Sequence, residues 1–174
     1  MSIVSAVPAP TDSALAPLYP GSDLLDAFAT TLPAGATSDP DRLARAVLAQ
    51  PAWWMRALMG MRDAAVAPLG VKTSRAIARE RNAGDRIGFF PVQARTSHEL
   101  IVGEDDRHLD FRASILLQDE KDGARTLTMI TVVHCHNRLG RCYLAVIAPF
   151  HRAIVRANIV RAARCGWPEG GERR

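Results

Sequence analysis

The longest uninterrupted helical pattern in this chain runs from Asn137 to Cys165, and it constrains the fold more than any other stretch. Apolar side chains recur in it at spacings of three and four residues, the period of one helix face. They are Leu139, Tyr143, Val146, Ile147, Phe150, Ile154 and Val155. Asn137 is suited to cap the helix, and Pro149 predicts a bend. Such a helix must pack on another element, and the strand-rich segment directly before it is the only candidate.

The composition is that of a soluble, single-domain protein: 174 residues, 48% hydrophobic and 23% charged. A net charge of +4 concentrated near the C-terminus raises the question of nucleic acid, but no recognised binding motif accompanies it, so this partner is not expected. Three cysteines without a C-x-x-C pair indicate reduced thiols. We see no signal peptide, and the longest apolar run is too short to span a membrane, so the prediction is a cytoplasmic protein.

The first third of the chain predicts an arm, a strand and two helices. Residues 1–18 are rich in Ala, Pro and Ser and predict a flexible or loosely docked arm. Residues 24–32 predict a strand, which Pro33 and Gly35 end. Capping and dipole signals at residues 38–41 predict a helix over 41–48, and a second helix is expected to begin at Pro51.

Residues 86–136 change to the two-residue period of strands. One strand is predicted over 86–95, with Pro91 indicating an edge position or a bulge. Others are expected to begin at Glu99 and to cover 108–118 and 126–136, the last two joined by a hairpin turn near Gly123. In the third of these strands, the face carrying Leu109, Phe111, Ala113, Ile115 and Leu117 is expected to point inwards. Consecutive strands followed by one long helix favour an α+β fold over α/β.

Five stretches carry a resemblance to a known family. They are residues 55–63 (MRALMGMRD), 87–92 (IGFFPV), 103–112 (GEDDRHLDFR), 136–141 (HNRLGR) and 149–152 (PFHR). They resemble the bacterial family of unknown function numbered 2867, and the element order is similar to the START-like superfamily. That resemblance implies a helix-grip fold, in which a curved antiparallel sheet wraps around the long C-terminal helix. It covers residues 19–165 as one domain, between the arm and a flexible basic tail at 166–174.

The densest ionisable stretch lies at residues 104–112. Alternation places Asp106, His108 and Asp110 on one strand face, where a histidine between carboxylates could act as a general acid or base. The alternative is a solvated strand end with weak ion pairs. Because the opposite face of this strand is the apolar one, these side chains are expected on the outside of the sheet or at an interface. That placement makes a catalytic role less expected.

His134 and His136 are two residues apart on a strand, a spacing that also occurs in metal sites. The predicted hairpin sets them near Asp110 and His108, so a site of three or four ligands can be drawn. A ladder of His and Asp side chains hydrogen-bonded across strands is the commoner result. We therefore predict no metal and no cofactor.

The expected inner lining is aromatic and aliphatic: Trp53, Trp54, Phe89, Phe111, Met129, Tyr143, Ile147 and Phe150. The same residues could enclose a ligand cavity or form a solid core, and only the START-like resemblance favours the cavity. The leading hypothesis is a domain that binds a small apolar molecule between the sheet and the last helix. The alternatives are a cyclase-, hydratase- or hydrolase-like enzyme using His108 and the acidic strand, and an interaction module that forms a homodimer or accompanies a reductase-type partner.

Overall fold

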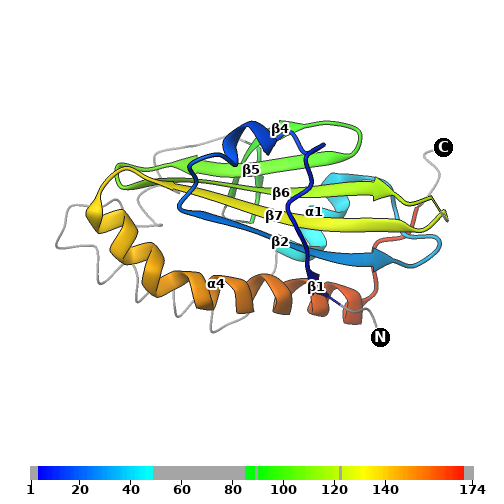
Figure 1. The fold of residues 1–174 in the computed structure, drawn as a ribbon. Coiled ribbons are helices and arrows are strands. Elements are labelled where there is room, and N and C mark those ends of the chain that lie inside the picture. The colour runs from blue at the N-terminus through cyan, green and yellow to red at the C-terminus, as the bar shows by residue number, and fades with distance from the viewer. Residues whose placement is uncertain (1–3, 49–84, 89, 122, 171–174) are drawn as a thin grey trace.

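A single seven-stranded antiparallel sheet forms the body of the molecule (Figure 1). The computed structural model describes residues 4–48, 85–88, 90–121 and 123–170. The strands, in the order β1-β2-β7-β6-β5-β4-β3 across the sheet, are β1 (Ser5–Ala6), β2 (Leu24–Leu32), β3 (Arg86–Ile87), β4 (Phe90–Arg95), β5 (Glu99–Asp105), β6 (Leu109–Asp119) and β7 (Arg125–Cys135). The helices are the 3₁₀ turn η1 (Ala16–Leu18), α1 (Pro40–Leu48) and α4 (Arg138–Cys165). The α+β class is confirmed.

The local signals in the centre of the sheet are confirmed. The strand predicted at 24–32 is β2, and the helix predicted at 41–48 is α1, where the carboxylate of Asp39 accepts a hydrogen bond from the amide of Asp41 at 3.0 Å. The hairpin joins β6 to β7 around Gly123, whose φ of 81° suits glycine. Its register places His134 directly opposite Asp110, as the turn predicts. The second helix, expected from Pro51, lies outside the described residues.

The strand predicted over residues 86–95 is wrong as one element. The chain reverses there, so that β3 and β4 form a hairpin at the edge of the sheet. Gly88 lies at the turn with φ of 60°, a left-handed conformation that glycine adopts without strain. The predictions from Pro91 are confirmed, because β4 lies near the edge and its register shifts between Val92 and Ala94.

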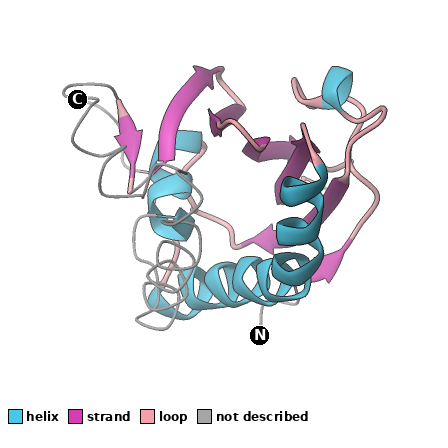
Figure 2. Ribbon diagram, turned by 90° about the vertical axis from the view of Figure 1, so that its left-hand side faces the viewer, coloured by secondary structure: helices cyan, strands magenta, loops and turns pink. Residues whose placement is uncertain are grey.

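Helices α1 and α4 cover one face of the sheet, which we call the inner face (Figures 1 and 2). The main core joins side chains of both helices to this face, including Val47 of α1, Ile115 of β6 and Ile159 of α4. The side chains of β6 expected to point inwards do so: Leu109, Phe111, Ala113, Ile115 and Leu117. Within the described residues, no helix is both long and apolar enough to cross a membrane.

Helix α4 begins as predicted, but its buried face coincides only in part with the expected stripe, from which Val155 is buried. The side chain of Asn137 caps it by accepting a hydrogen bond from the amide of Gly140 at 3.0 Å. The buried residues are Gly140, Leu144, Val155, Asn158, Ile159 and Ala162. Leu139, Val146 and Phe150 of the expected stripe are exposed instead. The buried face passes through Ala148 and His151, which do not stand out as apolar in the sequence. The helix contains Pro149, and it changes direction along its length (Figure 1).

After β1, the N-terminal arm lies on the opposite face of the sheet, which we call the outer face (Figure 1). Leu15 is 2% exposed and packs against Ile101, Leu116 and Ile130. The carboxylate of Glu99, itself 1% exposed, accepts hydrogen bonds from Ser13 Oγ at 2.6 Å and from the amide of Ala14 at 2.8 Å. The arm therefore covers the middle of the outer face.

Residues 166–170 lie against the loop that follows β2. Trp167 is buried in the main core, and the amide of Thr37 donates to the carbonyl of Pro168 at 2.7 Å. The amide of Gly170 likewise donates to the carbonyl of Gly35 at 2.9 Å. The first part of the expected tail thus closes the end of the core beyond α4.

Candidate functional site

One transverse row of the inner face carries smaller side chains than the rows on either side. The sheet register aligns Asp26, Thr131, Ala113 and Val102 across β2, β7, β6 and β5. The neighbouring row consists of Phe28, Met129, Ile115 and Leu100, and the row on the other side begins with Leu24, Val133 and Phe111. We call the smaller set the central row. Directly opposed cross-strand residues have Cβ atoms about 5 Å apart, so Asp26 and Thr131 are immediate neighbours.

Helix α4 places His151 over the polar end of the central row. His151 Nε2 lies 3.5 Å from Asp26 Oδ1, and the side chains of the two residues are 24% and 11% exposed. Arg152 Nε donates to the other carboxylate oxygen, Asp26 Oδ2, at 3.4 Å. Asp26 is therefore held between a partly buried imidazole and an arginine that reaches the surface.

Three buried polar atoms at this place form no hydrogen bond with any described residue: Asp26 Oδ1, Thr131 Oγ1 and His151 Nε2. Other buried atoms in the same condition include the hydroxyls of Thr30 and Ser114, Asp110 Oδ1 and His108 Nε2, so one such atom alone does not mark a site. A carboxylate oxygen and an imidazole nitrogen that face each other are more unusual, because a buried polar group without a partner costs about 1–3 kcal/mol, and more if charged. We call Asp26, Thr131 and His151 the inner polar cluster.

The inner polar cluster separates two apolar regions. On one side is the main core, with Phe28, Met129 and Val155. On the other is a smaller cluster with Leu24, Val133, Cys135 and Leu144, against which Phe111 and Ala148 pack. A molecule lying along the central row would have apolar walls at both sides and hydrogen-bonding groups at one end. This combination is typical of small-molecule sites.

Chemically, the cluster offers one acceptor and two groups of adaptable role. An ionised carboxylate oxygen only accepts hydrogen bonds, whereas a threonine hydroxyl and a neutral imidazole can donate or accept. A carboxylate facing one imidazole nitrogen also orients the ring and leaves its second nitrogen for proton transfer. The inner polar cluster therefore has the groups needed to bind a polar ligand group and to transfer a proton.

The histidines and acids singled out in the sequence lie on the outer face or at the end of the sheet. His136 Nε2 lies 2.9 Å from Asp110 Oδ2, and His134 Nε2 lies 2.8 Å from the carbonyl oxygen of Leu18 in the arm. His108 Nδ1 is 3.0 Å from the side-chain amide of Asn137, and the carboxylate of Asp106 accepts from the amide of Arg107 at 2.6 Å. Asp106, His108 and Asp110 therefore do not lie on the inner face. The bond of His134 reaches the arm, and that of His108 reaches the residue that caps α4.

The metal interpretation of His108, His134 and His136 gains no support from their placement. Within residues 4–48, 85–88, 90–121 and 123–170, no group of three or more His, Cys, Asp or Glu side chains is arranged to hold a metal ion. Instead, one ring nitrogen of each histidine lies next to a protein group: the carboxylate of Asp110, the carbonyl of Leu18 and the side-chain amide of Asn137.

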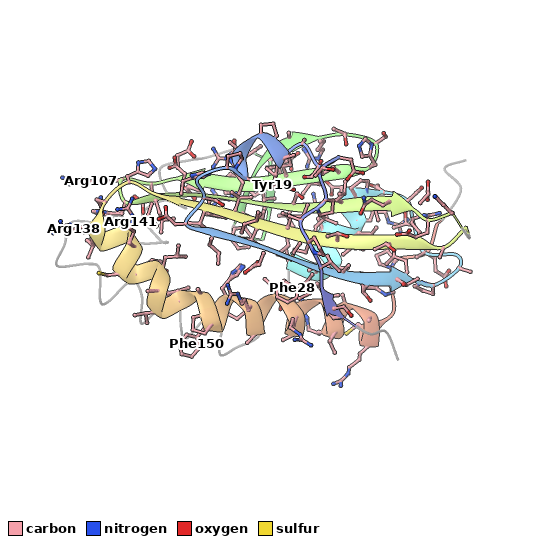
Figure 3. All side chains as sticks on the ribbon, in the orientation of Figure 1. Tyr19, Phe28, Arg107, Arg138, Arg141 and Phe150 are labelled. Atoms are coloured by element: carbon pink, nitrogen blue, oxygen red, sulfur yellow. The ribbon has the colours of Figure 1, made fainter. Side chains whose placement is uncertain are left out.

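The expected lining residues take different positions. Met129 is buried on the inner face, and Phe111 lies on the same face, edge-to-face with Phe90 at 5.7 Å between ring centroids. Tyr143 and Ile147 are half-buried on α4. Phe150 is 50% exposed and points away from the sheet, so it does not line the inner face (Figure 3). Trp53, Trp54 and Phe89 lie outside the described residues.

At the end of the sheet near the start of α4, the carboxylate of Asp23 is paired with hydrogen-bond donors. Asp23 accepts hydrogen bonds from the amide of Cys135 at 2.7 Å and from Arg141 Nε at 3.1 Å. The backbone bond first, and then Arg141, hold the pKa of Asp23 below its ordinary value. Burial and the nearby Asp23 raise the pKa of the Cys135 thiol, which makes it a poor nucleophile. The arginines at this end, among them Arg107, Arg138 and Arg141, are shown in Figure 3.

Asp26 and Thr131 are not predicted from the sequence as functional residues, and His151 is noted there only as part of a motif. A signal was present, because Asp26 interrupts the apolar face of β2 between Leu24 and Phe28, and Thr131 interrupts that of β7 between Met129 and Val133. What the sequence could not supply was the pairing of β2 with β7, which makes the two interruptions neighbours.

Comparison with known proteins gives a family but no function. No curated protein and no solved structure matches the chain. The family model described as Protein of unknown function (DUF2867) matches residues 18–158, which include every strand from β2 to β7 and most of α4. The chain therefore belongs to the DUF2867 family, and the inner polar cluster lies within the matched region.

Proposed function

We propose that this chain binds a small, mostly apolar molecule between the inner face of the sheet and α4, with the molecule's polar end at the inner polar cluster. The observation that carries the proposal is the set of buried, unpaired polar atoms at Asp26, Thr131 and His151, at the junction of two apolar clusters. A ligand group that bonded to these atoms would offset the cost of burying them.

The size pattern of the side chains supports the same location. The side chains of the central row are smaller than those of the rows on either side. On α4, the position one turn before His151 is Ala148, also a small residue. Ala113 and Val102 of this row already pack in the main core, so we place the ligand's polar end at the Asp26 and Thr131 end of the row. The START-like resemblance, which implies a ligand between a sheet and a C-terminal helix, points to the same region.

The first experiment is native mass spectrometry of the protein purified without organic solvent, with a matched pair of variants. Ala148→Leu adds volume on the inner side of α4, and Ala153→Leu makes the same change on an exposed position of the same helix. We expect a co-purifying apolar mass on the wild type and on Ala153→Leu, and a reduced occupancy on Ala148→Leu.

Thermal unfolding of the two variants separates a binding space from a solid core. If the region is open, Ala148→Leu stays within about 1 kcal/mol of the wild type, whereas overpacking a filled core costs about 1–3 kcal/mol. A clear destabilisation by Ala148→Leu, together with no bound mass on any of the proteins, would remove the proposal.

The facing of His151 and Asp26 supports a second candidate, an enzyme that moves a proton on the bound molecule. With Nε2 held towards Asp26 Oδ1, the Nδ1 atom of His151 is the group that would take or give the proton. Incubating the loaded protein in heavy water tests this directly. Deuterium entering a carbon position of the ligand with the wild type but not with His151→Gln would establish the chemistry, and no exchange with either would leave a binding protein.

A further inference from the structure

We infer that the molecule bound at this proposed site ends in a neutral hydrogen-bond donor, a hydroxyl or phenol group, and not in a carboxylate. The inference rests on the proposed function and adds the chemical class of the ligand. It follows from the geometry of the inner polar cluster.

The separation of Asp26 and His151 suits one bridging oxygen. Asp26 Oδ1 and His151 Nε2 are 3.5 Å apart, longer than the usual 2.7–3.2 Å of a direct N–H···O hydrogen bond, and neither atom bonds to any described residue. A single oxygen can lie about 2.8 Å from both atoms. A hydroxyl there donates its proton to Asp26 and accepts a hydrogen bond from the Nε2–H tautomer of His151.

The acceptor character of Asp26 excludes the other common end groups. An ether or ketone oxygen has no proton to give to the carboxylate, and the oxygens of an ionised fatty acid would face it with like charge in a buried place. Arg152 does not reverse this preference, because its Nε already bonds to the opposite oxygen, Asp26 Oδ2, and its side chain is 54% exposed.

The position of Thr131 favours a hydroxyl over other donor groups at the end of the ligand. It is 3% exposed, lies opposite Asp26 in the register, and its hydroxyl has no bond to a described residue. A threonine hydroxyl can donate to the second lone pair of the same ligand oxygen. An ammonium group could also donate to Asp26, but it would place a second positive charge beside Arg152, which already bonds to this carboxylate.

The test uses two series of probes that differ only in the end group. The aliphatic series is octan-1-ol, heptyl methyl ether and octanoate, and the aromatic series is 4-pentylphenol, 4-pentylanisole and 4-pentylbenzoate. Isothermal titration calorimetry with the full chain is expected to show the alcohol or phenol binding about 10-fold or more tightly than its ether and its acid, the effect of one hydrogen bond to a charged group.

Variants of the cluster residues test whether the preference for a hydroxyl arises at the inner polar cluster. In Asp26→Asn the side-chain amide can donate, so we expect the disadvantage of the ether and the acid to shrink to about threefold or less. The control, Asp110→Asn, makes the same change on the outer face and is expected to keep the full preference. Thr131→Val is expected to weaken the alcohol without improving the acid.

The possible results separate this inference from the proposed function. Acids that bind as tightly as the alcohols would overturn the hydroxyl preference while leaving a binding site in place. Binding of no probe in either series would count against the proposed function itself, and the inference would fall with it. A preference that survives Asp26→Asn unchanged would also overturn the inference, since it would arise elsewhere.

Discussion

Two carboxylates lie on opposite faces of the same sheet, and their hydrogen bonds differ. Glu99, on the outer face, is 1% exposed and accepts two short hydrogen bonds from the arm, at 2.6 Å and 2.8 Å. Asp26, on the inner face, has a side chain 11% exposed, with one long bond at 3.4 Å and one buried oxygen bonded to no described residue. Glu99 has the hydrogen bonds that a structural carboxylate needs. Asp26 has an acceptor site to which a bound ligand could donate. Hydrogen-bond satisfaction, more than residue type, separates the two roles.

The largest expected effect is on the outer face. Glu99→Ala leaves Ser13 Oγ and the amide of Ala14 without their acceptor, so we expect a loss of about 2–4 kcal/mol in the free energy of unfolding, measured with urea. The arm should also become sensitive to protease at concentrations that leave the wild type intact. Asp119→Ala is the control, because the side chain of Asp119 is 89% exposed and its ion pair is worth at most about 1 kcal/mol. If Glu99→Ala and Asp119→Ala lowered the free energy of unfolding equally, the hydrogen bonds of Glu99 would not be the structural feature that we infer.

A smaller effect, of the opposite sign, is expected on the inner face. Asp26→Asn removes a buried charge with incomplete bonding, so the free energy of unfolding should be unchanged or higher by up to about 2 kcal/mol. Ligand-free protein must be used, since a bound molecule would restore the missing bonds in the wild type alone. A loss as large as that of Glu99→Ala would show that Asp26 is a structural group, and the site would lose its central member.

The fold could be predicted where the signals are local. The alternation in β2, the capping residues of α1 and the turn at Gly123 each depend on residues close together in the chain, and each is confirmed. The reversal between β3 and β4 was missed because Gly88 stands alone in an apolar run, without a second turn residue beside it. The buried face of α4 was predicted only in part, because it also passes through Ala148 and His151, which do not stand out as apolar in the sequence.

The candidate site could not be predicted because its members meet only through long-range pairing. Thr131 reaches Asp26 through the pairing of β7 with β2, strands separated in the chain by α1 and by β3 to β6, and His151 joins them from α4. The ionisable stretch at 104–112 attracted the functional interpretation because its charges are adjacent in sequence. Adjacent charges on a strand are commonly solvated or paired across strands, as His136 and Asp110 are.

Asp23 sharpens the comparison as a third carboxylate, three residues before Asp26. Its pKa is lowered by the bond from the Cys135 amide and by Arg141, so the folded state favours its charged form. That contribution is fully present above the pKa of the unfolded chain, about 4, and is lost as the pH falls through the lower folded value. Asp23→Asn should therefore cost about 1 kcal/mol at pH 7 and progressively less below pH 4.

Urea titrations of the wild type and Asp23→Asn between pH 7 and pH 2.5 measure this directly. A cost of Asp23→Asn that stays the same from pH 7 to pH 2.5 would show that the bonds from Cys135 and Arg141 do not favour the charged form of Asp23 in the folded chain.

The smallest expected effect concerns Arg152, which among the described residues is the donor to the Asp26 carboxylate. The bond is long, at 3.4 Å, and the arginine is 54% exposed, so Arg152→Ala should change the free energy of unfolding by less than about 0.5 kcal/mol. Arg141→Ala, which removes the 3.1 Å bond to Asp23, should cost more, and urea unfolding of the two variants side by side gives the difference. A larger loss from Arg152→Ala would mean that this arginine secures the Asp26 carboxylate in the folded chain. The Asp26 side chain would then be as well bonded as Glu99, and the reason for placing a ligand beside it would be gone.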